Sequence, residues 1–184
     1  MSPTDIQLGT TNGGEQETPS LVALSTGGFA AAWAESSAGN ITLAKTMDYR
    51  SRVIDAAGVA TGPELLLAAN TFGRNPSLTA LGSGAFAVAW RKATDFSTTG
   101  LLVRIVDSSG AFTSPETLLP TTSFVVGSTP RLTTLASGRL FASWTIGTGV
   151  VGEASNVRAR VLDAKADFIS VDATSGGACF VPAP

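Results

Sequence analysis

Two short stretches of the chain hold polar and aromatic side chains that could contact a ligand. They lie in or near segments that differ among the three copies of an internal repeat described below. Variable segments on a repeated scaffold are where binding specificity usually resides. Two of these residues, Asp48 and Asp95, could also form the acid pair of a carbohydrate-active hydrolase, but no supporting motif surrounds them. The candidate contacts are Asp48, Tyr49, Arg50, Arg91, Lys92, Asp95 and Phe96.

The sequence contains no histidine, and this narrows the chemistry that it can perform. Histidine is the commonest general base, the usual partner of a serine or cysteine nucleophile and the commonest zinc ligand. The single cysteine, Cys179, allows no disulfide within the chain. We therefore expect a protein that is not an enzyme and that needs no cofactor.

Composition and charge exclude two classes of partner. Of 184 residues only 14% are charged, and the twelve lysines and arginines are scattered along a chain with a net charge of -2. A nucleic-acid-binding or membrane-surface protein would gather its basic residues into a patch. No apolar run reaches the length of a transmembrane helix. The start of the chain has no basic segment followed by an apolar core, so no export signal is visible in it.

A sixteen-residue pattern occurs three times without a gap and organises the whole chain. Residues 18–33 read TPSLVALSTGGFAAAW, residues 75–90 read NPSLTALGSGAFAVAW, and residues 129–144 read TPRLTTLASGRLFASW. Each copy predicts a β-hairpin, because two apolar runs flank a turn that contains glycine. The tryptophan that ends each copy could stack against a sugar, but its phase within the strand favours core packing. These tryptophans are Trp33, Trp90 and Trp144.

The second strand of each hairpin is apolar on both faces. In the first copy, Phe29 and Trp33 lie on one face, whereas Ala30 and Ala32 lie on the other. A strand with one face in water would alternate apolar and polar residues, so these strands must be covered on both sides. We expect the large face of one copy to pack on the small face of the next.

A third strand follows in each copy and ends in a shared arginine and aspartate motif, RVID, RIVD or RVLD. The aspartate is expected to cap the next turn, where glycine supplies a positive φ. The alternative, a calcium site, has too few oxygen ligands in D-x-x-G. Ala166 replaces the glycine in the third copy, so that turn should be less regular. The motif residues are Arg52, Arg104, Arg160, Asp55, Asp107 and Asp163.

A fourth strand is predicted nine residues beyond each aspartate, and its first residue is acidic: Glu64, Glu116 or Asp172. We expect these acids to pair with the motif arginines Arg52, Arg104 and Arg160 on the neighbouring strand. Spacing also relates residues 5–8, DIQL, to the fourth strands ELLL and ETLL. The predicted organisation is an N-terminal strand completing a blade (1–17), three repeats (18–71, 72–124 and 125–174) and an extended C-terminal arm (175–184).

The predicted fold is all-β, with three four-stranded repeats stacked as β-propeller-like blades and one extra N-terminal strand. A β-trefoil or a β-prism is the alternative, since both also contain three repeats of about 50 residues. Trefoil strands usually have one wetter face, and strands such as FAAAW therefore favour the propeller.

The repeat resembles a known one. P-S-L-x-x-L-x-x-G-x-F-x-x-x-W, followed by R-V-x-D-x-x-G and G-x-E-x-L, resembles the repeat of about 50 residues in large secreted bacterial adhesin-like and calcium-associated proteins, and more generally the TolB-type blade. The resemblance covers residues 5–172. It implies a propeller-like fold at the cell surface or outside the cell, reached by a route not visible in this chain. It does not imply a particular activity, because such blades support adhesion, glycan binding and scaffolding alike.

Three blades are fewer than a closed propeller contains, so we expect a homo-oligomer or an array that covers the free edges and faces. The first functional hypothesis is a binding or adhesion module, with a surface glycan as its ligand. The second is a structural subunit of a self-assembling surface appendage, fibre or particle. The third is a carbohydrate-active hydrolase, which the lack of histidine disfavours.

Overall fold

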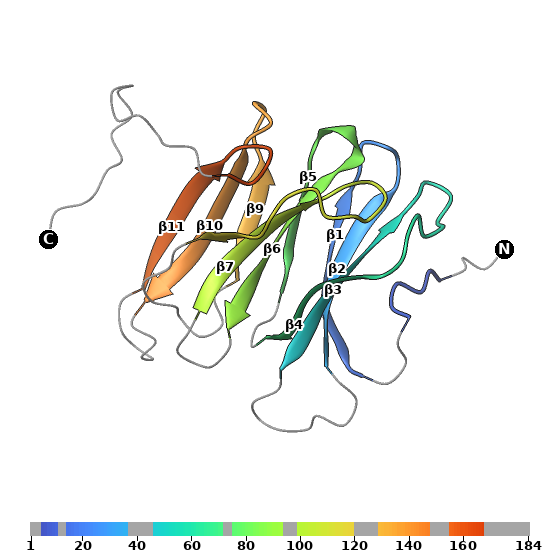
Figure 1. The fold of residues 1–184 in the computed structure, drawn as a ribbon, viewed down its shortest axis with the longest axis horizontal. Coiled ribbons are helices and arrows are strands. Elements are labelled where there is room, and N and C mark those ends of the chain that lie inside the picture. Colours follow the sequence, from blue (N-terminus) through green and yellow to red (C-terminus); the bar gives the residue numbers. More distant parts are fainter. Residues whose placement is uncertain are drawn as a thin grey trace, which may run out of the picture.

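The protein is represented by a computed structural model that describes residues 5–10, 14–36, 46–71, 75–93, 99–119, 129–147 and 155–167. These residues form three antiparallel sheets, which we call blades 1, 2 and 3 (Figure 1). Blade 1 contains β1 (Gln16–Ala23), β2 (Phe29–Ser36), β3 (Met47–Ile54) and β4 (Leu65–Thr71). Blade 2 contains β5 (Ser77–Ala80), β6 (Phe86–Ala93), β7 (Thr99–Val106) and β8 (Thr117–Leu119). Blade 3 contains β9 (Arg131–Thr134), β10 (Leu140–Gly147) and β11 (Ser155–Leu162).

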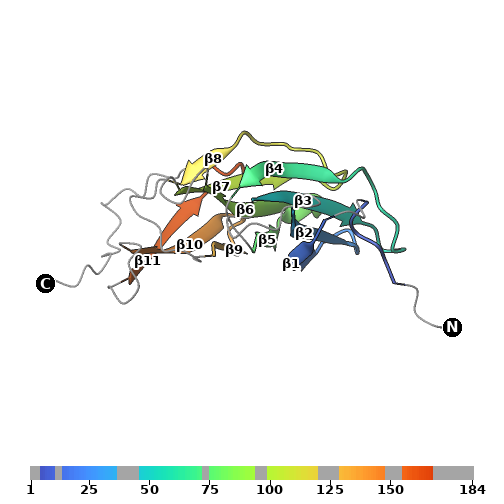
Figure 2. The ribbon, with the colours of Figure 1, turned by 90° about the horizontal axis from the view of Figure 1, so that it is seen from below.

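The strands of each blade pair in chain order, and the blades lie side by side. The first strands β1, β5 and β9 run along one edge of the row, and β4 and β8 run along the opposite edge (Figure 2). This arrangement confirms the predicted all-β fold of stacked propeller-like blades. The fourth strand expected for the third repeat falls within residues 168–174, outside the described residues. The helical content of the described part is one 3₁₀ turn at Gly82–Gly84, and nothing there forms a membrane-spanning helix.

Two hydrophobic clusters join the blades, one on each side of blade 2. In the first, Val88 and Trp90 of β6 lie among the small residues Ala30, Ala32 and Ala34 of β2. In the second, the large residues of β10 pack in the same way on the alanines of β6. Large-on-small packing is thus confirmed with one correction: the large face packs on the preceding copy, not on the next one.

The repeated tryptophans belong to the core, as predicted. The exposed fractions are 3% for Trp33, 0% for Trp90 and 4% for Trp144. Burial of a large aromatic side chain on this scale is among the strongest contributions to a β-sheet core. None of the three is open to a sugar.

The turns after β3, β7 and β11 share one hydrogen-bonding pattern. In the first, Asp55 Oδ1 accepts the backbone N–H groups of Ala57 and Val59, which is the predicted capping role. Asp107 and Asp163 accept in the same way. The prediction of a less regular third turn is wrong, because Ala166 adopts a φ of 68° and donates its N–H to the Asp163 carbonyl. The aspartate hydrogen bonds thus stabilise the same turn in all three repeats, whether its positive-φ position holds glycine or Ala166.

The N-terminal strand predicted to complete a blade is not formed among the described residues of one chain, and its pairing with strands elsewhere stays a prediction. Residues 5–10 contain no strand, and residues 16 and 17 already belong to β1. The segment instead lies on blade 1, where the carbonyl of Leu8 accepts a hydrogen bond from Arg52 Nη1 at 2.9 Å. Residues 5–8 resemble the fourth strands in sequence, but this resemblance does not determine which edge or face of a sheet they contact within one chain.

Candidate functional site

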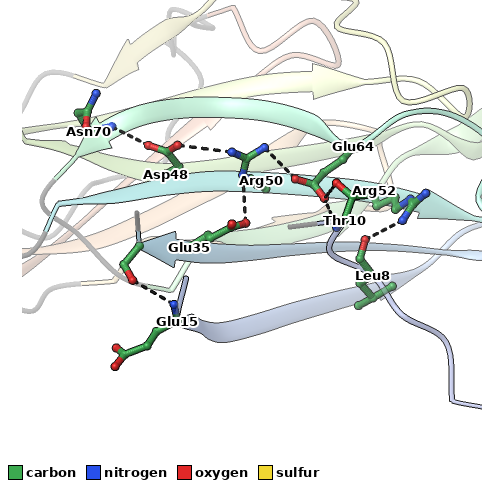
Figure 3. A network of polar contacts seen from close by, with 10 residues as sticks. Leu8, Thr10, Glu15, Glu35, Asp48, Arg50, Arg52, Glu64 and Asn70 are labelled. Atoms are coloured by element: carbon green, nitrogen blue, oxygen red, sulfur yellow. Dashed lines mark hydrogen bonds and ion pairs between the residues drawn. The ribbon is translucent and has the colours of Figure 1, made fainter. Parts of the chain in front are cut away.

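Arg50 is the centre of a charged network (Figure 3). The network lies on the face of blade 1 that points away from blade 2. Its Nη1 lies 2.8 Å from Glu64 Oε1, its Nε lies 3.1 Å from Glu35 Oε2, and its Nη2 lies 3.6 Å from Asp48 Oδ2. Three carboxylates therefore surround one guanidinium. We call these four residues the Arg50 network.

Strand register places the network on one face. Arg50 pairs with Trp33, and Asp48 pairs with Glu35, so these four side chains project from the same side of β2 and β3. The corresponding face of blade 2 carries Leu102 in place of Arg50, and that face is buried against blade 1. On blade 1, residues 5–10 lie on this face instead of another sheet, and a charged cluster is tolerated there.

Further hydrogen bonds hold the carboxylates. Glu64 Oε2 accepts from the backbone N–H and the hydroxyl of Thr10, at 2.7 Å and 2.9 Å, and Asp48 Oδ1 accepts from the N–H of Asn70 at 3.0 Å. The Glu35 and Glu64 side chains are only 8% and 5% exposed, whereas Asp48 and Arg50 are each 23% exposed. The Glu35 and Glu64 side of the network is therefore buried, and its Asp48–Arg50 edge is partly exposed to solvent.

The other predicted contacts do not join this edge. Tyr49 points to the opposite face of β3 and is fully buried in the core between blades 1 and 2, and Arg91 is buried as well. Burial raises the pKa of Tyr49 and lowers that of Arg91 from their ordinary values. The Lys92 side chain is half exposed, and its Nζ lies 3.9 Å from Glu116 Oε2.

Asp95 and Phe96 lie outside the described residues, and so does the suggested acid pair of Asp48 with Asp95. Of the predicted contacts, the structure thus brings Asp48 and Arg50 together in this network, and Tyr49 and Arg91 interact electrostatically as buried residues. Sequence reasoning missed Glu35 as a partner of Arg50. A signal was present, because Glu35 adds a charge to the otherwise apolar run FAAAWA of the second strand.

The motif arginines have three different environments. The predicted pairing of Arg52 with Glu64 is wrong, since Glu64 contacts Arg50 and Arg52 binds the Leu8 carbonyl. Arg104 stacks with its guanidinium carbon 3.3 Å from the centroid of the Phe112 ring and donates to the Ser114 carbonyl at 3.3 Å.

Burial lowers the pKa of Arg104, and the charge of Glu116 offsets part of that effect. Arg160 is exposed on β11, and Asp172, its expected partner, is outside the described residues. Arg52 and Arg104 thus make different contacts, and the pairing of Arg160 with Asp172 stays a prediction.

The described residues contain no group of three or more histidine, cysteine, aspartate or glutamate side chains that could hold a metal ion. The motif aspartates, the alternative calcium ligands, use their Oδ1 atoms to cap turns.

Blade 3 presents a second feature, its outward face, which is the side that points away from blade 2. The register of β10 with β11 places Phe141, Ser143, Thr145, Val157, Ala159 and Val161 on this face. Val157 is 75% exposed, whereas the equivalent residues Tyr49 in β3 and Leu101 in β7 are 0% exposed. The face that the following blade covers in blades 1 and 2 is therefore partly open in blade 3.

No family model and no curated protein matches the sequence. Among solved structures, the chain is similar to the endo-arabinase from Bacteroides thetaiotaomicron VPI-5482, with a TM-score of 0.49 and 13% identity over 80% of this chain and 57% of that one. It is also similar to the Penicillium chrysogenum alpha-L-arabinanase complexed with arabinobiose, with a TM-score of 0.44 and 15% identity over 77% of this chain and 44% of that one. This chain spans about half the length of these proteins. Likeness at this level carries no argument about activity.

Proposed function

We propose that this chain is a non-enzymatic, extracellular or cell-surface binding or adhesion module of propeller-like blades that self-associates. The observation that carries the proposal is the outward face of blade 3. The chain buries the equivalent face twice, in blades 1 and 2, and leaves Val157 75% exposed in blade 3. A sheet face with an exposed large apolar side chain that is open in one copy is a candidate site of association.

The Arg50 network supports binding in preference to catalysis. Its carboxylates form ion pairs with Arg50 or accept hydrogen bonds from Thr10 or Asn70. Carboxylates held in this way suit a binding surface better than a general acid and base. The open Asp48–Arg50 edge offers an acceptor and a donor side by side, which suits the hydroxyl groups of a surface glycan.

A glycan array probed with the labelled protein tests the binding part. We expect a selective signal for a surface polysaccharide, and we expect Asp48→Asn to weaken it by about tenfold, the cost of one charge-assisted hydrogen bond. Arg139→Ala, which changes an exposed arginine in the turn between β9 and β10, is the matched control and should leave the signal unchanged. Silence across a broad panel, or equal loss in both variants, would contradict glycan binding at this edge.

A further inference from the structure

A cleft of about 540 Å³ lies on blade 1, between residues 5–7 and the turn that follows β3. Arg52 of β3 forms part of its lining, together with residues 57–60 of the turn. Its two walls carry apolar side chains that are open to solvent, because Ile6 is 44% exposed and Val59 is 59% exposed. The cleft thus combines a guanidinium with two apolar walls.

The turns that follow β3 and β7 share their backbone structure. The isolated β-bridge Ile54↔Ala60 of blade 1 corresponds to the bridge Val106↔Phe112 of blade 2. The residue after each bridge donates its backbone N–H to the strand at 3.0 Å in both blades. Ala60 therefore stands at the position that Phe112 occupies in blade 2, and the two blades differ there in the side chain.

In blade 2 this position holds an aromatic ring against a guanidinium. The guanidinium carbon of Arg104 lies 3.3 Å from the centroid of the Phe112 ring, a cation–π contact. Arg104 Nε and Nη2 also donate to the Ser114 carbonyl, each at 3.3 Å. The third repeat has phenylalanine at the same position, Phe168, which lies outside the described residues. Among the three repeats, the first has alanine there.

Arg52 of blade 1 stands at the position of Arg104 without the phenylalanine ring of blade 2. Its Nη1 donates to the Leu8 carbonyl at 2.9 Å (Figure 3), and its buried Nε has no hydrogen-bond partner among the described residues. Alanine in place of phenylalanine removes a phenyl group from the surroundings of the guanidinium. The cleft, which Arg52 and Ala60 both line, lies on this side of Arg52.

We propose that this cleft binds a phenylalanine side chain of a partner protein. The ring lies on the Arg52 guanidinium, as the Phe112 ring lies on that of Arg104. A peptide carbonyl of the partner accepts a hydrogen bond from the guanidinium, as the Ser114 carbonyl does in blade 2. Blade 2 thus contains, within the same chain, the contacts that the ligand supplies in blade 1.

The lining of the cleft favours a neutral aromatic group over an aromatic acid. Asp5 and Arg52 are its charged residues, so a ligand carboxylate would meet a repulsion as well as an attraction. Ile6 and Val59 offer apolar contacts to the edges of a ring. The lining shares no residue with the Arg50 network, and the inference goes beyond the proposed glycan binding and self-association and depends on neither.

An NMR titration of the isotope-labelled full-length protein with N-acetyl-L-phenylalaninamide tests the site. We expect saturable shifts of the Arg52 Nε–H signal and of the Gly58 and Val59 amide signals. The cyclohexylalanine analogue of the same amide keeps the apolar surface but has no π face, and it should bind about fivefold more weakly. Equal affinity for the two amides, or no saturable shift at Arg52, would overturn the proposal.

Ala60→Phe provides a second test, because it supplies from the chain itself the ring that blade 2 has. We expect it to weaken binding of the phenylalanine amide by about tenfold or more. Ala136→Phe, which places the same ring on an exposed turn of blade 3, is the matched control and should bind as the parent does. Circular dichroism checks that both variants fold, and the comparison of the two amides in the parent needs neither variant. Undiminished binding by folded Ala60→Phe would overturn the proposal.

Discussion

Arg50 of blade 1 occupies the position that Leu102 occupies in blade 2, and carboxylates surround it in blade 1. Its guanidinium lies within 3.6 Å of the Glu35, Asp48 and Glu64 carboxylates, and two of these three side chains are less than 10% exposed. Carboxylates that are buried to this degree require a compensating cation. The stability of blade 1 therefore depends on a charge that blade 2 does not need.

Arg50→Leu tests this dependence. The variant leaves Glu35 and Glu64 without their cation, so we expect the free energy of unfolding to fall by about 2–4 kcal/mol in urea denaturation. Arg50→Lys keeps the charge and should lose less. Arg139→Ala, at an exposed site, should change the value by less than about 0.5 kcal/mol. A variant Arg50→Leu as stable as the parent would show that the network contributes nothing to folding.

The turn after β7 predicts a dependence on pH. Asp107 accepts hydrogen bonds from the Ser109 hydroxyl at 2.6 Å and from the Ala111 N–H at 2.9 Å, and these lower its pKa below the ordinary 3.8. A carboxyl whose pKa is depressed by folding stabilises the folded state above its unfolded pKa. That contribution is lost as the pH falls through the folded pKa.

Ser109→Ala removes the largest cause of the shift. We expect the pKa of Asp107 to rise toward its ordinary value in an NMR titration. The stability difference between parent and variant should be constant above about pH 5 and should shrink below the ordinary carboxyl range. A difference that stayed the same down to about pH 2 would assign the effect of Ser109 to packing and not to the carboxylate.

At the scale of elements, the second strand of each repeat sets the spacing between blades. Ala32 is fully buried against the large face of blade 2, so the sheets approach each other over methyl groups. Interiors packed at this density do not absorb extra methylene groups without strain. The alternation of small and large faces thus determines both the order and the closeness of the blades.

Ala32→Leu should therefore destabilise the chain by about 1–3 kcal/mol through overpacking. Ser143→Leu is the matched control, because it changes the equivalent position on the outward face of blade 3. Under dilute conditions it should change the free energy of unfolding by less than about 0.5 kcal/mol. Thermal and urea unfolding measure both. Equal losses in the two variants would contradict the packing of β6 on β2.

How far the sequence predicted these features depends on how local each one is. The hairpins, the apolar second strands and the aspartate-capped turns depend on neighbours within about ten residues, and a repeat displays them three times. The Arg50 network combines residues of β2 and β3 with Glu64, which immediately precedes β4, and Glu64 is not directly opposite Arg50, which pairs with Leu66. Such contacts depend on side-chain rotamers. The position of residues 5–8 depends on which sheet surface the segment can contact. A repeat pattern in the sequence does not specify that surface.

At the scale of the whole molecule, the two ends of the row of blades differ. The outward face of blade 1 is charged and lies against residues 5–10, whereas the outward face of blade 3 is partly apolar and carries the exposed Val157. Under the proposed self-association, two unlike ends predict a head-to-tail arrangement, because a face that is not self-complementary joins a different face of the next copy. Repeated association of this kind gives a ring if the rotation closes and an array if it does not.

Multi-angle light scattering of the parent protein beside Val157→Glu tests self-association most directly. The parent is expected to show a mass that is a multiple of 18.6 kDa at micromolar concentration, and Val157→Glu, which places a charge on the outward face of blade 3, should shift it toward 18.6 kDa. A parent that remained an 18.6 kDa monomer at every concentration, or an oligomer that Val157→Glu left unchanged, would contradict association through this face.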